Sequence, residues 1–182
     1  MIQIRRARPD DAAAMGAVHV ASWRDTYAGI LPDAYLTTLS AARIAAAYRR
    51  SMIERARGDA SFVACLPAGG EVVGFGTTGR ARRPGMGEGE IETLYLLPDW
   101  RDQGIGRRLM RAAAAHLGAV GFHSVFLWVL SANNAGWFYR RLGGRLVARE
   151  TIRVAGQAVE QSAVIWDPVA LLLEATAQPR AT

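Results

Sequence analysis

Two spacings of hydrophobic positions recur along the chain, and together they predict a mixed succession of strands and helices. Alternation of apolar and polar residues begins at residues 2–6, and apolar positions at helical spacing follow at residues 12–27. The other predicted strands are residues 61–66, 72–78, 90–97, 124–130, 146–154 and 158–166, and the other predicted helices are residues 41–56, 104–120 and 134–142. The order is therefore β-α-α-β-β-β-α-β-α-β-β, which indicates the α/β class.

Turn and cap residues separate these elements without dividing the chain. Gly29 ends the first helix, Ser40 is placed to cap the second, and residues 67–70 join two strands as a hairpin turn. Residues 155–157 form the corresponding turn between the last two strands. Because the sequence has no linker, repeat or break in composition, we expect one domain over residues 1–182, with about residues 167–182 as its C-terminal tail.

The composition is that of a soluble globular domain. Of the 182 residues, 51% are hydrophobic and 21% are charged, which is close to the average for such proteins. No apolar run approaches the roughly 20 residues that cross a bilayer, and the N-terminus lacks the basic and then apolar stretch of a signal peptide. We therefore expect a cytoplasmic protein without a membrane partner.

Charge and metal-binding residue types argue against two further functions. The net charge is +6, but the arginines are scattered rather than gathered on one element, so nucleic-acid binding is not expected. Cys65 is the single cysteine and lies in an apolar run, and the three histidines lack metal-ligand spacing. We accordingly expect no metal site.

The most informative chemistry lies at residues 101–108, which read Arg-Asp-Gln-Gly-Ile-Gly-Arg-Arg between a predicted strand and a predicted helix. The first N–H groups of a helix have no intrahelical acceptor, and they lie at the positive end of the helix dipole. Gly104 and Gly106 let a ligand approach the backbone closely and permit a positive φ. This pattern predicts a site for a phosphate or pyrophosphate.

Two familiar phosphate-binding loops do not match this segment. The dinucleotide-binding fingerprint needs a third glycine or an alanine where Leu109 stands. The Walker-type loop needs Gly-Lys-Ser/Thr, whereas Gly106 is followed by Arg107. A third interpretation is a plain strand-to-helix turn without a ligand, and the loop alone does not decide between that turn and a phosphate site.

The segments on either side of the loop supply the missing information. Residues 94–98 (Leu-Tyr-Leu-Leu-Pro) precede it, and residues 133–135 (Asn-Asn-Ala) and 138–144 (Phe-Tyr-Arg-Arg-Leu-Gly-Gly) follow it. Together with Arg101-x-x-Gly104-x-Gly106 they closely resemble the GNAT superfamily of acyl-CoA-dependent N-acetyltransferases. Residues 22–32 resemble the first-helix region of one large group of bacterial members, whereas Gly144 departs from the phenylalanine usual at that position.

The resemblance implies a fold, a reaction and a co-substrate. The fold is a mixed, mostly antiparallel central sheet flanked by helices, and the reaction is direct transfer of an acetyl group from acetyl-CoA to a primary amine in a ternary complex. The backbone of Leu94 and Leu96 would pair with the pantetheine arm, residues 103–108 would surround the pyrophosphate, and Asn133 would bond the cofactor. The residues implied in cofactor binding are Leu94, Tyr95, Leu96, Arg101, Asp102, Gln103, Gly104, Ile105, Gly106, Arg107, Arg108, Asn133 and Tyr139.

Such a reaction needs an acid and a base. By the same resemblance Tyr139 is the candidate acid that protonates or stabilises the departing thiolate, and its alternative role is core packing beside Phe138. Glu90 matches the position of a carboxylate base in many relatives. Glu92 lies one strand period away, so we expect both carboxylates on one side of the strand. Glu90, Glu92 and ordered water stay open as the base.

The acceptor is not identified by the sequence. Trp23, Tyr27, Tyr35 and Trp166 are placed to wall an acceptor pocket, although helical aromatic residues are more often part of a core. We expect a small-molecule or peptide amine as the partner, and the resemblance allows a homodimer without deciding it. The alternative function is a CoA-binding regulatory or interaction module without turnover.

Overall fold

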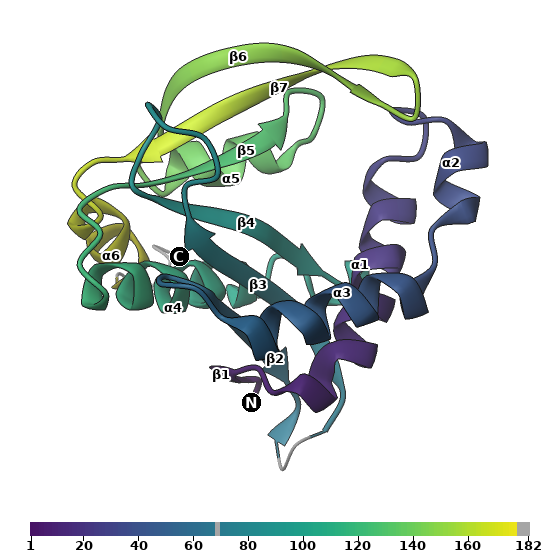
Figure 1. The fold of residues 1–182 in the computed structure, drawn as a ribbon, viewed down its shortest axis with the longest axis horizontal. Helices are drawn as coiled ribbons and strands as arrows, with labels where there is room; N and C mark the ends of the chain where they lie inside the picture. The colour runs from purple at the N-terminus through teal and green to yellow at the C-terminus, as the bar shows by residue number, and fades with distance from the viewer. Residues whose placement is uncertain (68–69, 178–182) are drawn as a thin grey trace.

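A computed structural model describes residues 1–67 and 70–177 of the chain. Its centre is one seven-stranded sheet with the strand order β1-β2-β3-β4-β5-β7-β6 (Figure 1). The strands are β1 (Gln3–Arg6), β2 (Ala60–Cys65), β3 (Val72–Arg80), β4 (Gly89–Leu96), β5 (Val125–Leu130), β6 (Arg145–Val154) and β7 (Gln157–Trp166). The helices are α1 (Ala12–Thr26), α2 (Asp33–Thr38), α3 (Ala41–Glu54), α4 (Ile105–Ala119), α5 (Ala135–Arg141) and α6 (Ala170–Ala177).

The predicted order of elements is confirmed, with one helix added near the N-terminus and one near the C-terminus. Ser40 caps α3 as expected, because its hydroxyl accepts the Arg43 N–H at 3.3 Å. Residues 33–38 form α2, which spans too few residues to show a helical period. Part of the expected C-terminal tail forms α6, where Leu172 is fully buried. Residues 68–69 of the first hairpin turn and residues 178–182 of the tail lie outside the described part of the chain.

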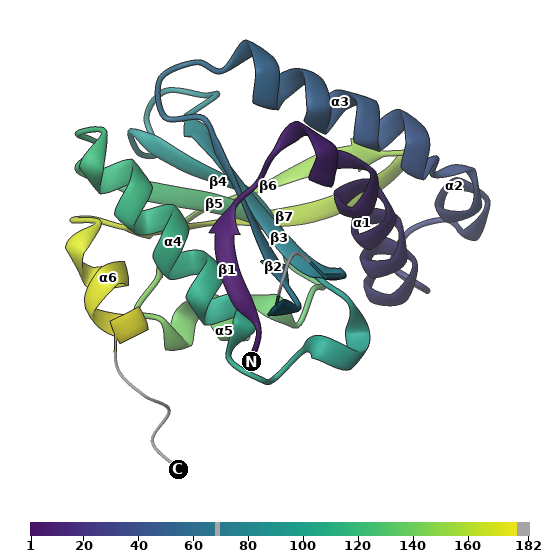
Figure 2. The same cartoon turned by 90° about the horizontal axis from the view of Figure 1, so that it is seen from below.

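The sheet is mostly antiparallel, and helices cover both faces of its N-terminal half. Side chains alternate between faces along a strand, so Val63 and Phe75 pack with residues of α1 and α3. Ala64 points the other way and packs with residues of α4, and Val73 joins it there because it is the extra residue at a register shift, where Cys65 pairs with Val72 and Ala64 with Gly74. Figure 2 shows α4 and α6 on one side of these strands and α1 and α3 on the other. In the described part of the chain, no helix is long and apolar enough to span a bilayer.

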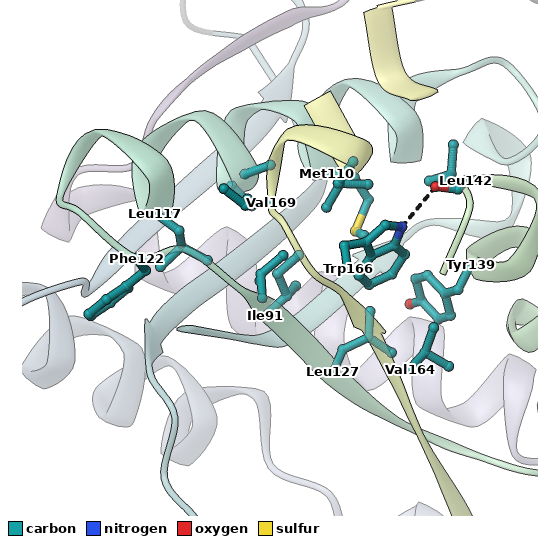
Figure 3. Packing of buried hydrophobic residues seen from close by; sticks show 14 of the residues in the cluster. Ile91, Met110, Leu117, Phe122, Leu127, Tyr139, Leu142, Val164, Trp166 and Val169 are labelled. Atoms are coloured by element: carbon teal, nitrogen blue, oxygen red, sulfur yellow. Dashed lines mark hydrogen bonds between the residues drawn. The ribbon is translucent and has the colours of Figure 1, made fainter. Parts of the chain in front are cut away.

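A second cluster of buried residues fills the space between α4, α5, α6 and the C-terminal strands (Figure 3). Its largest member is Trp166, whose side chain is completely buried and donates from Nε1 to the Leu142 carbonyl oxygen at 2.8 Å. Tyr139, Leu127 and Val164 lie next to this indole in Figure 3. The bond fixes the end of α5 against β7, and with it the position of Tyr139.

The parallel pair β4 and β5 is the point where the sheet opens. These strands pair only at Gly89 with Val125 and at Glu90 with Phe126, and beyond that they diverge (Figure 1). Residues 91–96 of β4 therefore pair with β3 on one side and with no strand of the described chain on the other. We call this side of residues 91–96 the free edge of β4.

An irregularity in β4 marks the start of the free edge. Ile91 pairs with Thr78 and Thr93 pairs with Thr77, which leaves Glu92 as an extra residue between them. Such a bulge disturbs the alternation of side chains and increases the local twist. The bulge and the divergence from β5 thus fall on the same few residues.

Candidate active site

The free edge of β4 presents backbone hydrogen-bonding groups of two sequence-predicted residues. The Leu97 N–H donates to the Val73 carbonyl oxygen at 2.9 Å, so the backbone of Leu97 faces β3. Backbone groups alternate in direction along a strand, which turns those of Leu96 and Leu94 toward the free edge. The backbone of Tyr95, which lies between them, faces β3, where Tyr95 pairs with Phe75. An extended ligand could pair with Leu94 and Leu96 here as a further strand would.

The loop at residues 101–104 brings the chain from β4 to the start of α4. Asp102 and Gly104 have φ values of 59° and 76°, in the left-handed region. The first helical bond runs from the Arg108 N–H to the Gly104 carbonyl oxygen at 3.2 Å. Gly104 at the N-cap has no side chain to accept from the first turn, so the N–H groups of residues 105–107 face outward at the positive end of the helix dipole.

The basic side chains of this loop have different surroundings. Arg101 pairs with Asp25 at 2.5 Å and donates to the Thr26 hydroxyl at 3.2 Å, which ties the loop to the end of α1. Arg108 donates to the Ile2 carbonyl oxygen at 2.9 Å. Arg107 has a buried Nε without a hydrogen-bond partner among the described residues. Of the arginines expected to face a phosphate, Arg107 is thus distinguished by a buried donor that lacks a partner in the described part of the chain.

Space beside the first turn of α4 also fits a ligand that approaches the backbone. A Cβ added at Gly106 would lie 3.4 Å from Leu96 Cδ1 and 3.4 Å from Phe138 Cζ. Any larger side chain would therefore extend between β4 and α5. Gln103 donates from Nε2 to the Asp99 carbonyl oxygen at 2.9 Å and so braces the loop. The residues present fit an extended pantetheine arm that ends in a pyrophosphate at α4.

Asn133 joins the two sides of the opening. Its Oδ1 accepts the Ala135 N–H at 2.9 Å and so satisfies the first turn of α5. Its Nδ2 donates to the Tyr27 hydroxyl at 3.3 Å, across to the end of α1. The sequence predicted the role at the start of the helix, whereas the bond to Tyr27 follows only from the fold.

Tyr139 on α5 is a core residue whose hydroxyl belongs to the same neighbourhood. The side chain is 6% exposed, and its ring lies 5.3 Å from the ring of Phe138 and 6.4 Å from that of Trp166 (Figure 3). Burial, and to a lesser extent the nearby Tyr27 and Tyr95, raises the pKa of Tyr139 above its usual value. The packing role is therefore confirmed, and the phenol keeps its proton at neutral pH.

Glu90 is buried at the end of the β4–β5 pairing. Its side chain is 2% exposed and is held by the Arg82 guanidinium, while the Arg82 backbone N–H donates to Oε2 at 3.1 Å. This hydrogen-bonded pair raises the pKa of Arg82. The carboxylate is thus fixed in place by a residue of the β3–β4 loop.

Glu92 lies on the same face of β4 as Glu90, as the spacing predicted. Its Oε2 accepts from the Thr77 hydroxyl at 3.2 Å, and that hydroxyl is also 2.9 Å from the Thr93 hydroxyl. Burial raises the pKa of Glu92, with a smaller contribution from the charge of Glu90. A carboxylate with a raised pKa is better suited to accept a proton near neutral pH.

A pocket that sequence reasoning missed opens next to Glu90. It has a volume of about 300 Å³ and is lined by Arg82, Arg83, Glu90, Trp128 and Gln161. We call it the arginine pocket. The only sequence signal was the adjacent pair of arginines in a glycine-rich loop, and no periodic pattern links that loop to β5 and β7.

The expected aromatic wall is only partly present. Trp23 packs edge-on against Tyr27 at 4.9 Å and lies 6.4 Å from Tyr35 between ring centroids. The buried Trp23 Nε1 has no hydrogen-bond partner among the described residues. Trp166 was wrongly expected to join this wall, because it is fully buried in the cluster around α4 and α5.

We find no group of three or more histidine, cysteine, aspartate or glutamate side chains placed to hold a metal ion in residues 1–67 and 70–177.

The candidate site consists of a free strand edge, an uncapped helix start, two acidic side chains and a buried tyrosine. All of these lie around the opening between β4 and β5.

Comparison with known proteins identifies the family. Residues 20–144 match the family model described as the acetyltransferase (GNAT) family. The chain is 31% identical over 173 residues to an uncharacterised N-acetyltransferase, YuaI, of Bacillus subtilis, and the match covers 94% of this chain and 96% of that protein.

Solved structures of low sequence identity share the fold. The structure of yncA from Salmonella typhimurium, a putative acetyltransferase with acetyl-CoA, superposes with a TM-score of 0.69 at 21% identity and covers 100% of this chain and 99% of its own. The PaiA N-acetyltransferase of Thermoplasma acidophilum, in complex with coenzyme A, gives a TM-score of 0.64 at 20% identity, with coverage of 89% and 98%.

Proposed function

The chain belongs to the GNAT family of acetyltransferases, and from this premise we propose that it moves an acetyl group from acetyl-CoA to a primary amine by direct attack in a ternary complex. The observation that carries the proposal is the free edge of β4, which leads from Glu92 to the uncapped start of α4. We propose that residues 1–182 act as one catalytic domain.

The donor would be held mainly by backbone groups. Leu94 and Leu96 pair with the amides of the pantetheine arm, and the N–H groups of residues 105–107 receive the pyrophosphate. Arg107 adds a charge-assisted bond from the Nε that is without a partner in the described chain. This orientation brings the thioester toward the bulge at Glu92.

Transfer then requires loss of a proton from the acceptor ammonium. In our proposal Glu92 receives this proton, directly or through water, because its pKa is raised by burial. Glu90, fixed by Arg82, orients the ammonium from the same face. The amine nitrogen forms a bond to the carbonyl carbon, and the bond from that carbon to sulfur breaks.

Tyr139 would stabilise the leaving thiolate. A phenol with a raised pKa gives up its proton reluctantly, so we assign it the donation of a hydrogen bond to the sulfur rather than complete proton transfer. Its position is set by packing against Phe138 and Trp166, which pre-organises the hydroxyl.

Release of free thiol from acetyl-CoA, measured across a panel of primary amines, tests the proposal. Tyr139→Phe should lower kcat by about 10- to 100-fold while leaving the affinity for CoA within about twofold. Binding of CoA without thiol release for any amine would instead favour a regulatory or interaction module. An unchanged kcat in Tyr139→Phe would remove the tyrosine from the mechanism.

A further inference from the structure

The arginine pocket lies on the sheet face away from α4. Along β5, Val125, Leu127 and Val129 belong to the cluster packed around α4 and α5, so the alternate residue Trp128 faces the opposite side. Gln161 alternates in the same way with Val164 and Trp166 of that cluster. The pocket therefore opens on the side of the sheet where Glu90 is held by Arg82.

The pocket presents two exposed guanidinium groups, each of which is paired with a carboxylate. The side chains of Arg82 and Arg83 are 64% and 54% exposed, whereas that of Glu90 is 2% exposed. Glu150 on β6 neutralises Arg83 through contacts of 2.6 and 3.0 Å and also accepts from Gln161 Nε2 at 2.6 Å. The Glu90 carboxylate is thus covered by its partner, the Glu150 side chain is 32% exposed beside Arg83, and both arginines line the open volume.

Both arginines keep donors for a ligand. Arg82 contacts Glu90 through its Nε, its Nη2 and its backbone N–H, which leaves Nη1 for another acceptor. Arg83 contacts Glu150 through Nη1 and Nη2, which leaves Nε. Arg83 also lies over the Trp128 ring, 4.8 Å from the centroid, and this contact restricts its orientation. Two oriented guanidinium groups are suited to a carboxylate.

The pocket is next to the place where the acetyl group would be transferred. Glu90 is the last residue of β4 that pairs with β5, and the free edge begins at the following residue. A donor that runs along this edge from α4 therefore ends beside the arginine pocket. A volume of about 300 Å³ is at the lower end for ligand pockets, which suits a small molecule rather than a folded protein.

We propose that the acceptor is a free α-amino acid, with its carboxylate bound by Arg82 and Arg83 and its amine directed toward Glu90 and Glu92. This inference rests on the proposed acetyl transfer and adds the class of the acceptor. The exposed guanidinium groups at the pocket rim and the acidic side chains of β4 provide one partner for each of the two charges of such a zwitterion.

The experiment compares free L-amino acids with their carboxamides and with the corresponding decarboxylated amines, by thiol release from acetyl-CoA. Loss of a charge-assisted bond to a carboxylate predicts that kcat/KM is about 10- to 100-fold higher for the free acids. Arg83→Gln should lower kcat/KM for the acids alone and so reduce this preference, and Arg82 accounts for the part that remains. Arg83→Lys should keep more of the preference than Arg83→Gln, since the charge remains.

Arg149→Gln is the matched control, because Arg149 is an exposed arginine on β6 next to Glu150 and does not line the pocket. It should leave the preference for free acids unchanged. The wild-type ratio of acid to carboxamide decides the inference even where a variant folds poorly.

Carboxamides or neutral amines that are acetylated as well as the free acids would overturn the amino-acid assignment and leave the transferase activity intact. The same holds if Arg83→Gln retains the full preference. Absence of thiol release with every amine, although CoA binds, would overturn the acetyl transfer itself and the acceptor class with it.

Discussion

Two acidic residues on one strand, Glu90 and Glu92, have different surroundings and are therefore suited to different tasks. Glu90 is buried beneath Arg82, so its charge is compensated before any substrate arrives. Glu92 accepts a single hydroxyl bond from Thr77, and burial raises its pKa. Glu92 thus combines a raised pKa with oxygens that no guanidinium group engages in the described part of the chain.

We expect Glu92→Gln to change the pH dependence of the reaction. A base must be deprotonated to act, so activity falls as the pH drops through the pKa of Glu92, which lies above the ordinary glutamate value. In Glu92→Gln this acidic limb of the kcat profile should disappear, and kcat on the plateau should fall by about 10- to 100-fold. A pH–rate profile of both proteins measures the effect.

Glu90→Gln serves as the comparison. It keeps the Glu92 carboxylate, so the acidic limb should persist, shifted to lower pH because the charge of Glu90 raises the pKa of Glu92. An acidic limb that survives in Glu92→Gln and is lost in Glu90→Gln would assign the base to Glu90 instead.

For single residues, the sequence predicts which face of a strand a side chain lies on, but not which residues contact that side chain. The strand period placed Glu90 and Glu92 on one face, and the structure agrees. It could not show that Arg82 covers Glu90, because the loop between β3 and β4 has no periodic pattern. Nor could it show that Arg101 reaches Asp25, a contact between residues far apart in the sequence.

At the scale of elements, the free edge of β4 is a set of backbone donors and acceptors without a strand partner. We expect CoA to slow hydrogen exchange of the Leu94 and Leu96 amides by about tenfold or more, because paired amides exchange only when the structure opens. The Leu97 amide, bonded to Val73 at 2.9 Å, should change little. Exchange followed by NMR with and without CoA measures all three.

Leu97 is the internal control of that experiment, since it lies on the same strand but faces β3. Equal protection of Leu94, Leu96 and Leu97 by CoA would indicate general stabilisation instead of pairing at the edge. No change at Leu94 and Leu96 would contradict the position proposed for the pantetheine arm.

The first turn of α4 gives a second prediction. Gly106→Leu should weaken CoA binding by about 100-fold or more, because the side chain would extend between β4 and α5, where a Cβ already contacts Leu96 and Phe138 at 3.4 Å. Isothermal titration with CoA measures this affinity. Gly118→Ala on the same helix is the control, since among the described residues its Cβ would meet only Val169, at the ordinary contact distance of 3.6 Å. Unchanged affinity in Gly106→Leu would exclude this turn as the pyrophosphate site.

The hydrophobic pattern predicted most elements because long helices and strands repeat it several times. It missed α2, whose six residues complete fewer than two turns. The hydrophobic pattern also did not predict the bulge at Glu92, because the position of an extra residue depends on how β4 pairs with β3. The divergence of β4 from β5 depends on how the two strands pair, so the sequence of neither strand predicts it.

At the scale of the whole molecule, the sheet consists of two parts joined by a short parallel contact. Strands β1 to β4 form one part and β5, β7 and β6 the other, and only two residue pairs connect them. Other contacts cross this junction on the side of α1, where Tyr27, Leu31 and Leu36 form an apolar cluster with Leu130, Val154 and Val159. Among them is the hydrogen bond from Asn133 to Tyr27, between residues far apart in the sequence, which therefore depends on the complete fold.

We expect Tyr27→Phe to lower the free energy of unfolding by about 1 kcal/mol, because the Asn133 Nδ2 loses its acceptor inside the protein. For a chain of this size that corresponds to a fall in Tm of about 2–4 °C. Tyr35→Phe is the matched control, since among the described residues the Tyr35 side chain makes ring contacts, such as that with Trp23, and its hydroxyl makes no hydrogen bond. Calorimetric unfolding of both variants measures the difference. Equal Tm values for the two variants would show that this bond does not stabilise the junction between the two parts of the sheet, and would leave that role to the apolar packing of Tyr27, Leu31 and Leu36 with Leu130, Val154 and Val159.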